Sequence, residues 1–134
     1  KKDRVDDAVA ATQAALKEGI VPGGGIMLLR AYFALKDAGD EYLVESLYSP
    51  FMKILSNAGY YVDDEDMEML ANSSFNTGYD ALKGKWCDLR LRGIIDPAKV
   101  VRVALENAAS TALTILSTST VIVLEQQPQN IPQW

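Results

Sequence analysis

Apolar residues recur every three or four positions along much of the chain, which is the spacing of side chains on one face of an α-helix. The first such stretch, residues 3–18, predicts a helix, and Gly19 follows it at a position where glycine commonly ends helices. Asp3, Asp6 and Asp7 are expected in the first turn of this helix, where the helix dipole favours carboxylates.

A second helix is predicted to follow three consecutive glycines, residues 23–25, and to end near residue 36. From residue 41 to residue 58 the helical spacing resumes, but Pro50 lies inside this stretch and lacks the backbone N–H that a helix interior needs. Either the helix kinks at Pro50 or Ser49 caps a second helical segment. The apolar positions of the helix after the glycines are Ile26, Leu29, Tyr32 and Phe33.

An acidic helix and a hairpin are predicted in the middle of the chain. Residues 62–70 are expected to form a short helix with Asp63 as its N-cap. Two segments, 78–82 and 86–89, flank a turn that contains Gly84, a pattern typical of a β-hairpin.

The last predicted helix runs for about twenty residues from Pro97, with Asp96 as its N-cap. Residues 120–124 are β-branched and apolar and have no evident partner in the chain, so we expect this strand to pair with another subunit. Residues 126–134 are expected to form a frayed tail. These elements predict a mainly α fold with a small β-hairpin and a C-terminal strand.

Composition narrows the class of protein. With 134 residues, 49% hydrophobic and 23% charged, the chain suits one globular domain. A formal net charge of −5 argues against nucleic acid as a general partner. The most apolar tract, residues 104–124, is interrupted by Glu106 and Asn107, so no membrane span is expected.

The chain has no histidine and a single cysteine, Cys87. Catalysis would therefore depend on carboxylates, on backbone amides, or on groups from another chain segment. A lone cysteine excludes an internal disulfide and fits a reducing compartment, so we expect cytoplasmic localisation. Because the sequence begins at Lys1 within a charged helical pattern, we expect it to be a piece of a longer protein.

The three glycines before the second helix allow two interpretations. They can form a flexible connection, or they can let a nucleotide lie directly against the backbone at a helix N-terminus. The segment matches neither a G-x-G-x-x-G fingerprint nor a P-loop, and no phosphate-binding loop is visible in the chain.

The acidic candidates are similarly open to two interpretations. Asp96 can cap a helix or accept hydrogen bonds from ribose hydroxyls. Asp7 can be explained by the helix dipole, or it can orient a water that attacks a phosphoryl group. The acidic run 63–66 lacks the spacing of a calcium loop, so we interpret it as a solvated helix face and expect no metal site.

Five sequence blocks, in one order, carry a family resemblance. Together they resemble the C-terminal part of group I chaperonins, the bacterial GroEL and Hsp60 class. The resemblance extends over almost the whole chain. The blocks are residues 2–8, 19–25, 78–81, 93–100 and 104–110.

The resemblance implies roles for particular residues. Asp7 matches the catalytic aspartate that positions the hydrolytic water. Glu18 and Arg102 match a pair that ties the intermediate domain to the equatorial domain. The family carries asparagine at the position of Asp80, so this chain departs from the pattern there. The positions that match the family's nucleotide-binding site are Gly23, Gly24, Gly25, Tyr79, Asp80, Ala81 and Asp96.

The resemblance also implies an architecture. Residues 1–18 would be an intermediate-domain helix, residues 19–125 the C-terminal part of the equatorial ATP-binding domain, and residues 126–134 a flexible tail. The intact protein would be a homo-oligomeric ring that uses ATP to refold unfolded client proteins with a GroES-type co-chaperonin. Mg²⁺ would be bound mainly by a preceding segment, so this chain alone is not expected to be a competent ATPase.

Two other classes of function remain open at the level of sequence. A chaperonin-like paralogue could have lost ATPase activity and kept only a helical scaffold, although the presence of Asp7 and Asp96 argues against this. A free-standing helical interaction module is the second alternative. Such a module should begin with its own helix cap, whereas this chain opens within a helical pattern.

Overall fold

The computed structural model describes residues 2–37 and 41–120, and the fold is mainly α as predicted. The helices lie in the order α1, α2, α3, α4, α5 and α6, with four short strands between them. Helix bounds are α1 Lys2–Glu18, α2 Ile26–Leu35, α3 Glu41–Ser46, α4 Ser49–Asn57, α5 Asp64–Asn72 and α6 Ala98–Ser117. Strand bounds are β1 Ile20–Pro22, β2 Thr77–Asp80, β3 Lys85–Asp88 and β4 Ile95–Pro97.

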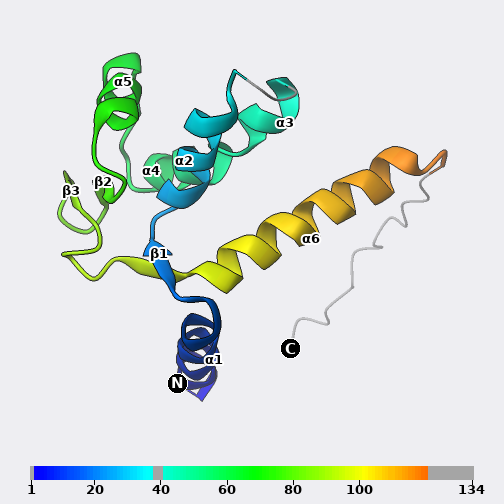
Figure 1. The fold of residues 1–134 in the computed structure, drawn as a ribbon, viewed down its shortest axis with the longest axis horizontal. Coiled ribbons are helices and arrows are strands. Elements are labelled where there is room, and N and C mark those ends of the chain that lie inside the picture. Colours follow the sequence, from blue (N-terminus) through cyan, green and yellow to red (C-terminus); the bar gives the residue numbers. More distant parts are fainter. Residues whose placement is uncertain (1, 38–40, 121–134) are drawn as a thin grey trace, which may run out of the picture.

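Figure 1 shows α2 to α5 and the β2–β3 hairpin gathered on one side, while α1 and α6 extend away from the β1 region. The hydrophobic core lies within that gathered part. It consists of Ile26, Leu29, Phe51, Leu55, Leu70 and Leu89. Neither α1 nor α6 contains a buried residue, so these two helices do not build a core of their own.

Helix α1 ends as predicted but begins earlier than expected. Gly19 follows Glu18 with a φ of 80°, and its N–H donates to the carbonyl of Ala15 at 2.8 Å. Because α1 already begins at Lys2, only Asp3 among the acidic residues lies in the first turn. The expectation that Asp6 and Asp7 lie there is wrong, and the helix dipole does not explain the position of Asp7.

Pro50 breaks the stretch 41–58 into two helices. The turn at Leu47 and Tyr48 separates α3 from α4, and Pro50 falls in the first turn of α4, where its missing N–H would have no partner anyway. The N-cap is Tyr48 without a side-chain bond, so Ser49 is not the cap.

The acidic helix α5 has the predicted cap. The Asp66 amide donates to the Asp63 carboxylate at 2.8 Å, and the Asp63 amide donates back to Asp66 at 3.4 Å. This reciprocal capping box satisfies two N–H groups that a helix start would otherwise leave free.

The predicted hairpin is present, with β2 antiparallel to β3 in a register from Thr77 opposite Asp88 to Asp80 opposite Lys85. Its turn is organised by Asp80, whose carboxylate accepts from the amides of Leu82 and Lys83, both at 3.1 Å. Asp80 is only 5% exposed, so it is a structural acceptor within the turn.

A second two-stranded ladder was not predicted. Antiparallel pairing places Val21 of β1 opposite Asp96 of β4, with Pro22 opposite Ile95. This pairing keeps Asp96 extended, so α6 begins at Ala98 and its N-cap is Pro97, without a side-chain bond. The expectation that Asp96 caps this helix is therefore wrong. The strand predicted at residues 120–124 lies outside the described residues from residue 121 onward, and so does the tail predicted at residues 126–134.

Gly25 and Gly59 form a matched test of packing at the glycine segment. Both have positive φ, which costs a non-glycine residue about 1–2 kcal/mol. A Cβ on Gly25 would also lie 3.0 Å from the backbone of Phe51, whereas Gly59 has nothing within 4 Å. Gly25→Ala should therefore lower the free energy of unfolding by about 3 kcal/mol and Gly59→Ala by about 1 kcal/mol, measured by denaturant titration. Equal losses would contradict the close approach at Phe51.

Candidate functional site

The β1–β4 ladder joins the two segments that sequence analysis singled out. At the end of the ladder, where β1 ends and β4 begins, the Gly23 N–H donates to the carbonyl of Ile94 at 3.0 Å. The glycine segment and the strand that contains Asp96 are therefore neighbours, although more than seventy positions separate Asp96 from these glycines along the chain. These are the predicted site residues that the structure brings together most directly.

The three glycines have different surroundings. Gly23 is buried, and a Cβ there would lie 3.2 Å from the backbone atoms Ile94 C and Ile95 N. Gly25 packs against Phe51. Gly24 has a φ of 65° and nothing within 4 Å of its Cβ position, so its backbone is open to a ligand. Packing explains two of the glycines, and only Gly24 leaves space for another molecule.

Helix α2 starts directly after these glycines. Gly25 is its N-cap in a left-handed conformation and offers no side-chain cap to the first amides of the helix. An uncapped helix start carries partial positive charge and unpaired N–H groups, which favours polar or anionic ligands. The open backbone at Gly24 lies beside this helix start.

Asp96 is a half-buried carboxylate without a side-chain hydrogen bond to any described residue. Burial raises the pKa of its carboxyl above the ordinary value. Since no protein donor stabilises the charge, the carboxylate remains available to accept hydrogen bonds from a bound hydroxyl-bearing ligand.

The hairpin residues Tyr79, Asp80 and Ala81 differ in accessibility. The Tyr79 ring packs in an aromatic cluster, 4.5 Å from the Tyr60 centroid and 5.1 Å from the Trp86 centroid. Asp80 is occupied by its own turn, and Ala81 is exposed. An asparagine carbonyl could accept the same two amide bonds as Asp80 does, so the departure from the family pattern leaves the turn intact.

The hairpin and the glycine segment are connected through the core. Gly25 packs against Phe51, and the Phe51 ring lies 6.5 Å from the ring of Trp86 on β3. The structure therefore places the hairpin on the same body as the helix start.

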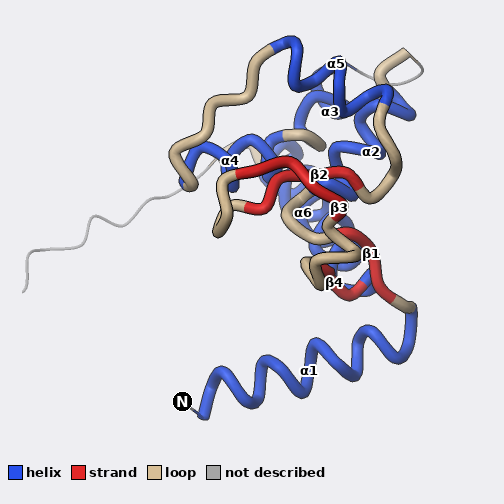
Figure 2. The backbone as a smooth tube through the Cα atoms, turned by 90° about the vertical axis from the view of Figure 1, so that its left-hand side faces the viewer, coloured by secondary structure: helices blue, strands red, loops and turns tan. Residues whose placement is uncertain are grey.

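Asp7 is not brought to this group of residues. It is exposed on α1, eleven residues before Glu18, which corresponds to about 17 Å along the helix axis. Figure 2 shows α1 running away from the other helices, with the N-terminal end farthest from β1. Any contact between Asp7 and a ligand at Gly24 would require α1 to change its orientation.

Glu18 and Arg102 form an ion pair at the base of α1. Arg102 donates from Nε to Glu18 at 3.0 Å and from Nη2 at 2.6 Å, and from Nη1 to both oxygens of Glu106 at 2.8 and 2.9 Å. The side-chain hydrogen bond from Arg102 lowers the pKa of Glu18, and the two carboxylates raise the pKa of Arg102. The Ala98 N–H also donates to the Gly19 carbonyl at 3.0 Å.

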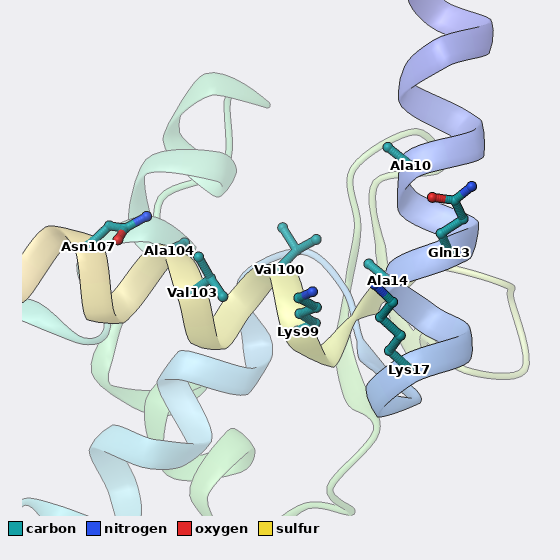
Figure 3. A pocket seen from close by; sticks show the side chains of 9 residues that line it. All are labelled: Ala10, Gln13, Ala14, Lys17, Lys99, Val100, Val103, Ala104 and Asn107. Atoms are coloured by element: carbon teal, nitrogen blue, oxygen red, sulfur yellow. The ribbon is translucent and has the colours of Figure 1, made fainter.

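A groove of about 450 Å³ lies where α1 crosses α6. Figure 3 shows the side chains of both helices along it, including Lys17 from α1 and Lys99 from α6. No carboxylate, hydroxyl or thiol lines the groove, and its charged side chains are the two lysines. The lining residues are Ala10, Gln13, Ala14, Lys17, Lys99, Val100, Val103, Ala104 and Asn107.

The acidic run has local structural roles. Asp63 and Asp66 form the capping box, and the Tyr60 hydroxyl donates to Asp66 at 2.8 Å, which raises the pKa of Tyr60. Across residues 2–37 and 41–120, no three acidic or cysteine side chains are grouped to hold a metal ion.

Sequence analysis missed Arg30. Its guanidinium is half-buried and donates to carbonyl and hydroxyl oxygens between α5 and β2, and burial lowers its pKa. The sequence did contain a signal. Arg30 lies four residues after Ile26 and three before Phe33, so it shares the apolar face of α2. A charged residue on such a face requires buried acceptors.

Comparison with known proteins decides the family. The model of the TCP-1/cpn60 chaperonin family matches residues 1–126. The chain belongs to this family. It is 45% identical, over 93% of its length, to the mitochondrial chaperonin homolog Hsp-60 of Caenorhabditis elegans. Its fold is similar to a crystal structure of a group III chaperonin in the open state, with a TM-score of 0.68 and 29% identity over 81% of the chain.

The chain spans about a quarter of the length of these relatives, covering 23% of the worm protein and 25% of the group III chaperonin chain. The family match confirms the predicted chaperonin family.

In the part of the chain that the structure describes, no helix has both the length and the apolar character needed to cross a bilayer.

The half-buried carboxylate of Asp96 should make the free energy of unfolding depend on pH. Because burial raises its folded-state pKa, the ionised carboxylate destabilises the fold at neutral pH, and the protonated form does not. Asp96→Asn should therefore raise the free energy of unfolding at pH 7. This advantage should shrink as the pH falls through the raised pKa of Asp96, and it should be absent below the ordinary carboxyl pKa of about 4.

The measurement is denaturant unfolding of both proteins across that pH range, with Asp6→Asn on the exposed face of α1 as the control. A parent protein more stable than Asp96→Asn at pH 7 would mean that the Asp96 carboxylate has a stabilising partner.

Proposed function

We propose that this chain supplies the adenosine side of the ATP site in a ring-forming chaperonin that refolds non-native polypeptides. One observation carries the proposal. The β1–β4 ladder pairs the strand that leads into the open backbone of Gly24 with the strand that carries the unpartnered carboxylate of Asp96, in a chain that belongs to the chaperonin family. Backbone amides at a helix start and an accepting carboxylate suit a polar ribose.

The residues present fit a nucleoside better than a phosphate chain. Asp96 would accept from ribose hydroxyls, Gly24 would lie against the nucleotide, and the exposed end of the hairpin at Ala81 would border the adenine. The bound ATP would provide the phosphoryl group whose hydrolysis drives the cycle. We propose that Mg²⁺ and the phosphates are held mainly by a part of the protein outside this chain.

Asp7 would act as the residue that orients the attacking water. Its carboxylate can accept a hydrogen bond from that water and hold it in line with the phosphoryl group. Since Asp7 lies far from Gly24 here, this role requires α1 to turn about its C-terminal end. Gly19 with its positive φ and the ion pair between Glu18 and Arg102 lie at that end. Residues 1–18 would be the intermediate-domain helix, and residues 19–125 the C-terminal part of the equatorial domain.

The same proposal extends to the assembly of the intact protein. The intact protein would form a homo-oligomeric ring, bind unfolded clients and use a co-chaperonin of the GroES type. The worm relative is mitochondrial by its name, so cytoplasmic localisation stays a prediction from the lone cysteine.

The test compares Asp7 with Asp96 in the full-length protein. Asp7→Ala should leave nucleotide affinity near the parent value and slow hydrolysis of bound ATP by about 100-fold, the scale expected for a lost general base. Asp96→Ala should instead weaken nucleotide binding by about tenfold, because it removes a charged hydrogen-bond acceptor. Single-turnover hydrolysis and equilibrium binding, measured for both variants, separate the two effects.

Asp6→Ala is the matched control, since Asp6 precedes Asp7 on the same exposed helix. Wild-type hydrolysis by saturated Asp7→Ala would contradict the catalytic role. A parent protein that binds no ATP would favour the alternative, a chaperonin-like scaffold without ATPase activity.

A further inference from the structure

Arg30 binds the connection between α5 and the β2–β3 hairpin through an unusual number of hydrogen bonds. Its Nη1 donates to the carbonyl of Leu70, and its Nε donates to Phe75 O at 3.3 Å. Its Nη2 donates to Ser73 Oγ at 3.1 Å, to Ser74 O at 2.6 Å and to Thr77 O at 3.3 Å. One guanidinium thus bonds to five of the eight residues from Leu70, in the last turn of α5, to Thr77, the first residue of β2.

This charge has no carboxylate partner. Among the residues that the structure describes, the ion pairs involve Arg102 and not Arg30. Withdrawing an arginine from water is costly unless acceptors replace its hydration. Here the acceptors are oxygens of the connecting segment, together with the Leu70 carbonyl in the last turn of α5. The helix dipole favours a cation at that end of the helix. The arrangement therefore fixes the conformation of the segment.

The segment held by Arg30 leads directly into the hairpin. Thr77, whose carbonyl is one of the acceptors, is the first residue of β2, and Tyr79 to Ala81 follow it. The base of the hairpin is also held by a bond from the Leu89 N–H to Asn76 O at 3.0 Å. A movement of this segment would therefore shift the whole hairpin.

Arg30 lies on the same helix as the glycine segment. Gly25 is the N-cap of α2, and Arg30 follows five residues later, slightly more than one helical turn along the axis. One helix thus carries the glycine segment at its start and, in its middle, the arginine that binds the segment leading into the hairpin.

We propose that Arg30 is a positioning residue that fixes the β2–β3 hairpin relative to the glycine segment. In the proposed nucleotide site this hairpin forms the adenine-side wall. This inference rests on the proposed function. Arg30 does not contact the nucleotide; it acts through residues 73–77, which hold the hairpin in place.

The geometry requires arginine. A guanidinium presents its donors in a planar fork, and three nitrogens of Arg30 serve acceptors on five residues. A lysine ammonium has three donors at one point and cannot reach these acceptors together. Arg30→Lys keeps the charge on a slightly shorter side chain while releasing part of the segment.

The experiment measures equilibrium binding of two probes, ATP and ribose 5-triphosphate, to the full-length assembled protein. The second probe lacks the base, so it does not contact the adenine-side wall. Arg30→Lys should raise the Kd for ATP by about tenfold and change the Kd for ribose triphosphate by less than about twofold. Arg90→Lys is the control, because Arg90 is exposed on the turn after β3.

An unchanged ATP affinity, or an equal loss for both probes, would overturn the proposal, since a purely structural defect weakens both alike. If Arg30→Lys does not assemble, Ser73→Ala removes one acceptor without altering α2, and it should show the same selective loss at a smaller size of about twofold. A parent protein that binds ATP no better than ribose triphosphate would instead refute the adenosine assignment of the proposed function. A parent with clear base discrimination and an Arg30 variant without selective loss would refute only the role of Arg30.

Discussion

The pairing of β1 with β4 is the constraint on which the rest of the structure depends. Three residue pairs, from Ile20 opposite Pro97 to Pro22 opposite Ile95, join two chain segments that lie far apart in sequence. Helix α1 enters this ladder, α2 leaves it, and α6 begins directly after it. Because α1 and α6 contain no buried residue, their placement depends on the ladder, on the bonds at Gly19 and Arg102, and on the exposed contact between the two helices.

The division between packing and function is clearest among the conformationally special residues. Gly23 and Gly25 are required because other backbone segments approach them closely, whereas Gly24 is open. Asp80 organises a turn, whereas the carboxylate of Asp96 accepts no hydrogen bond from a described residue. In each case the residue that the fold does not use is the one that a ligand could use. This contrast supports Gly24 and Asp96 as the centre of the candidate site.

Much of the fold could be predicted because it is encoded locally. Helical spacing predicted the helices, Asp63 predicted the cap of α5, and the glycine turn predicted the hairpin. The β1–β4 ladder could not be predicted, since strands of three residues that each contain a proline show no alternating pattern. Asp96 was misassigned as a cap for that reason, because its partner Val21 is distant in sequence. Arg30 was missed, although it shares the apolar face of α2, because all but one of its acceptors are backbone oxygens, which carry no residue-type signal.

The central claim is that the ladder assembles the adenosine side of a nucleotide site. A structure of the full-length protein with a non-hydrolysable ATP analogue tests it most directly. The account predicts a ribose hydroxyl within about 3 Å of the Asp96 carboxylate and the nucleotide in contact with the backbone of Gly24. A bound analogue whose ribose lies beyond hydrogen-bonding distance of Asp96, with the backbone of Gly24 still exposed to solvent, would contradict it.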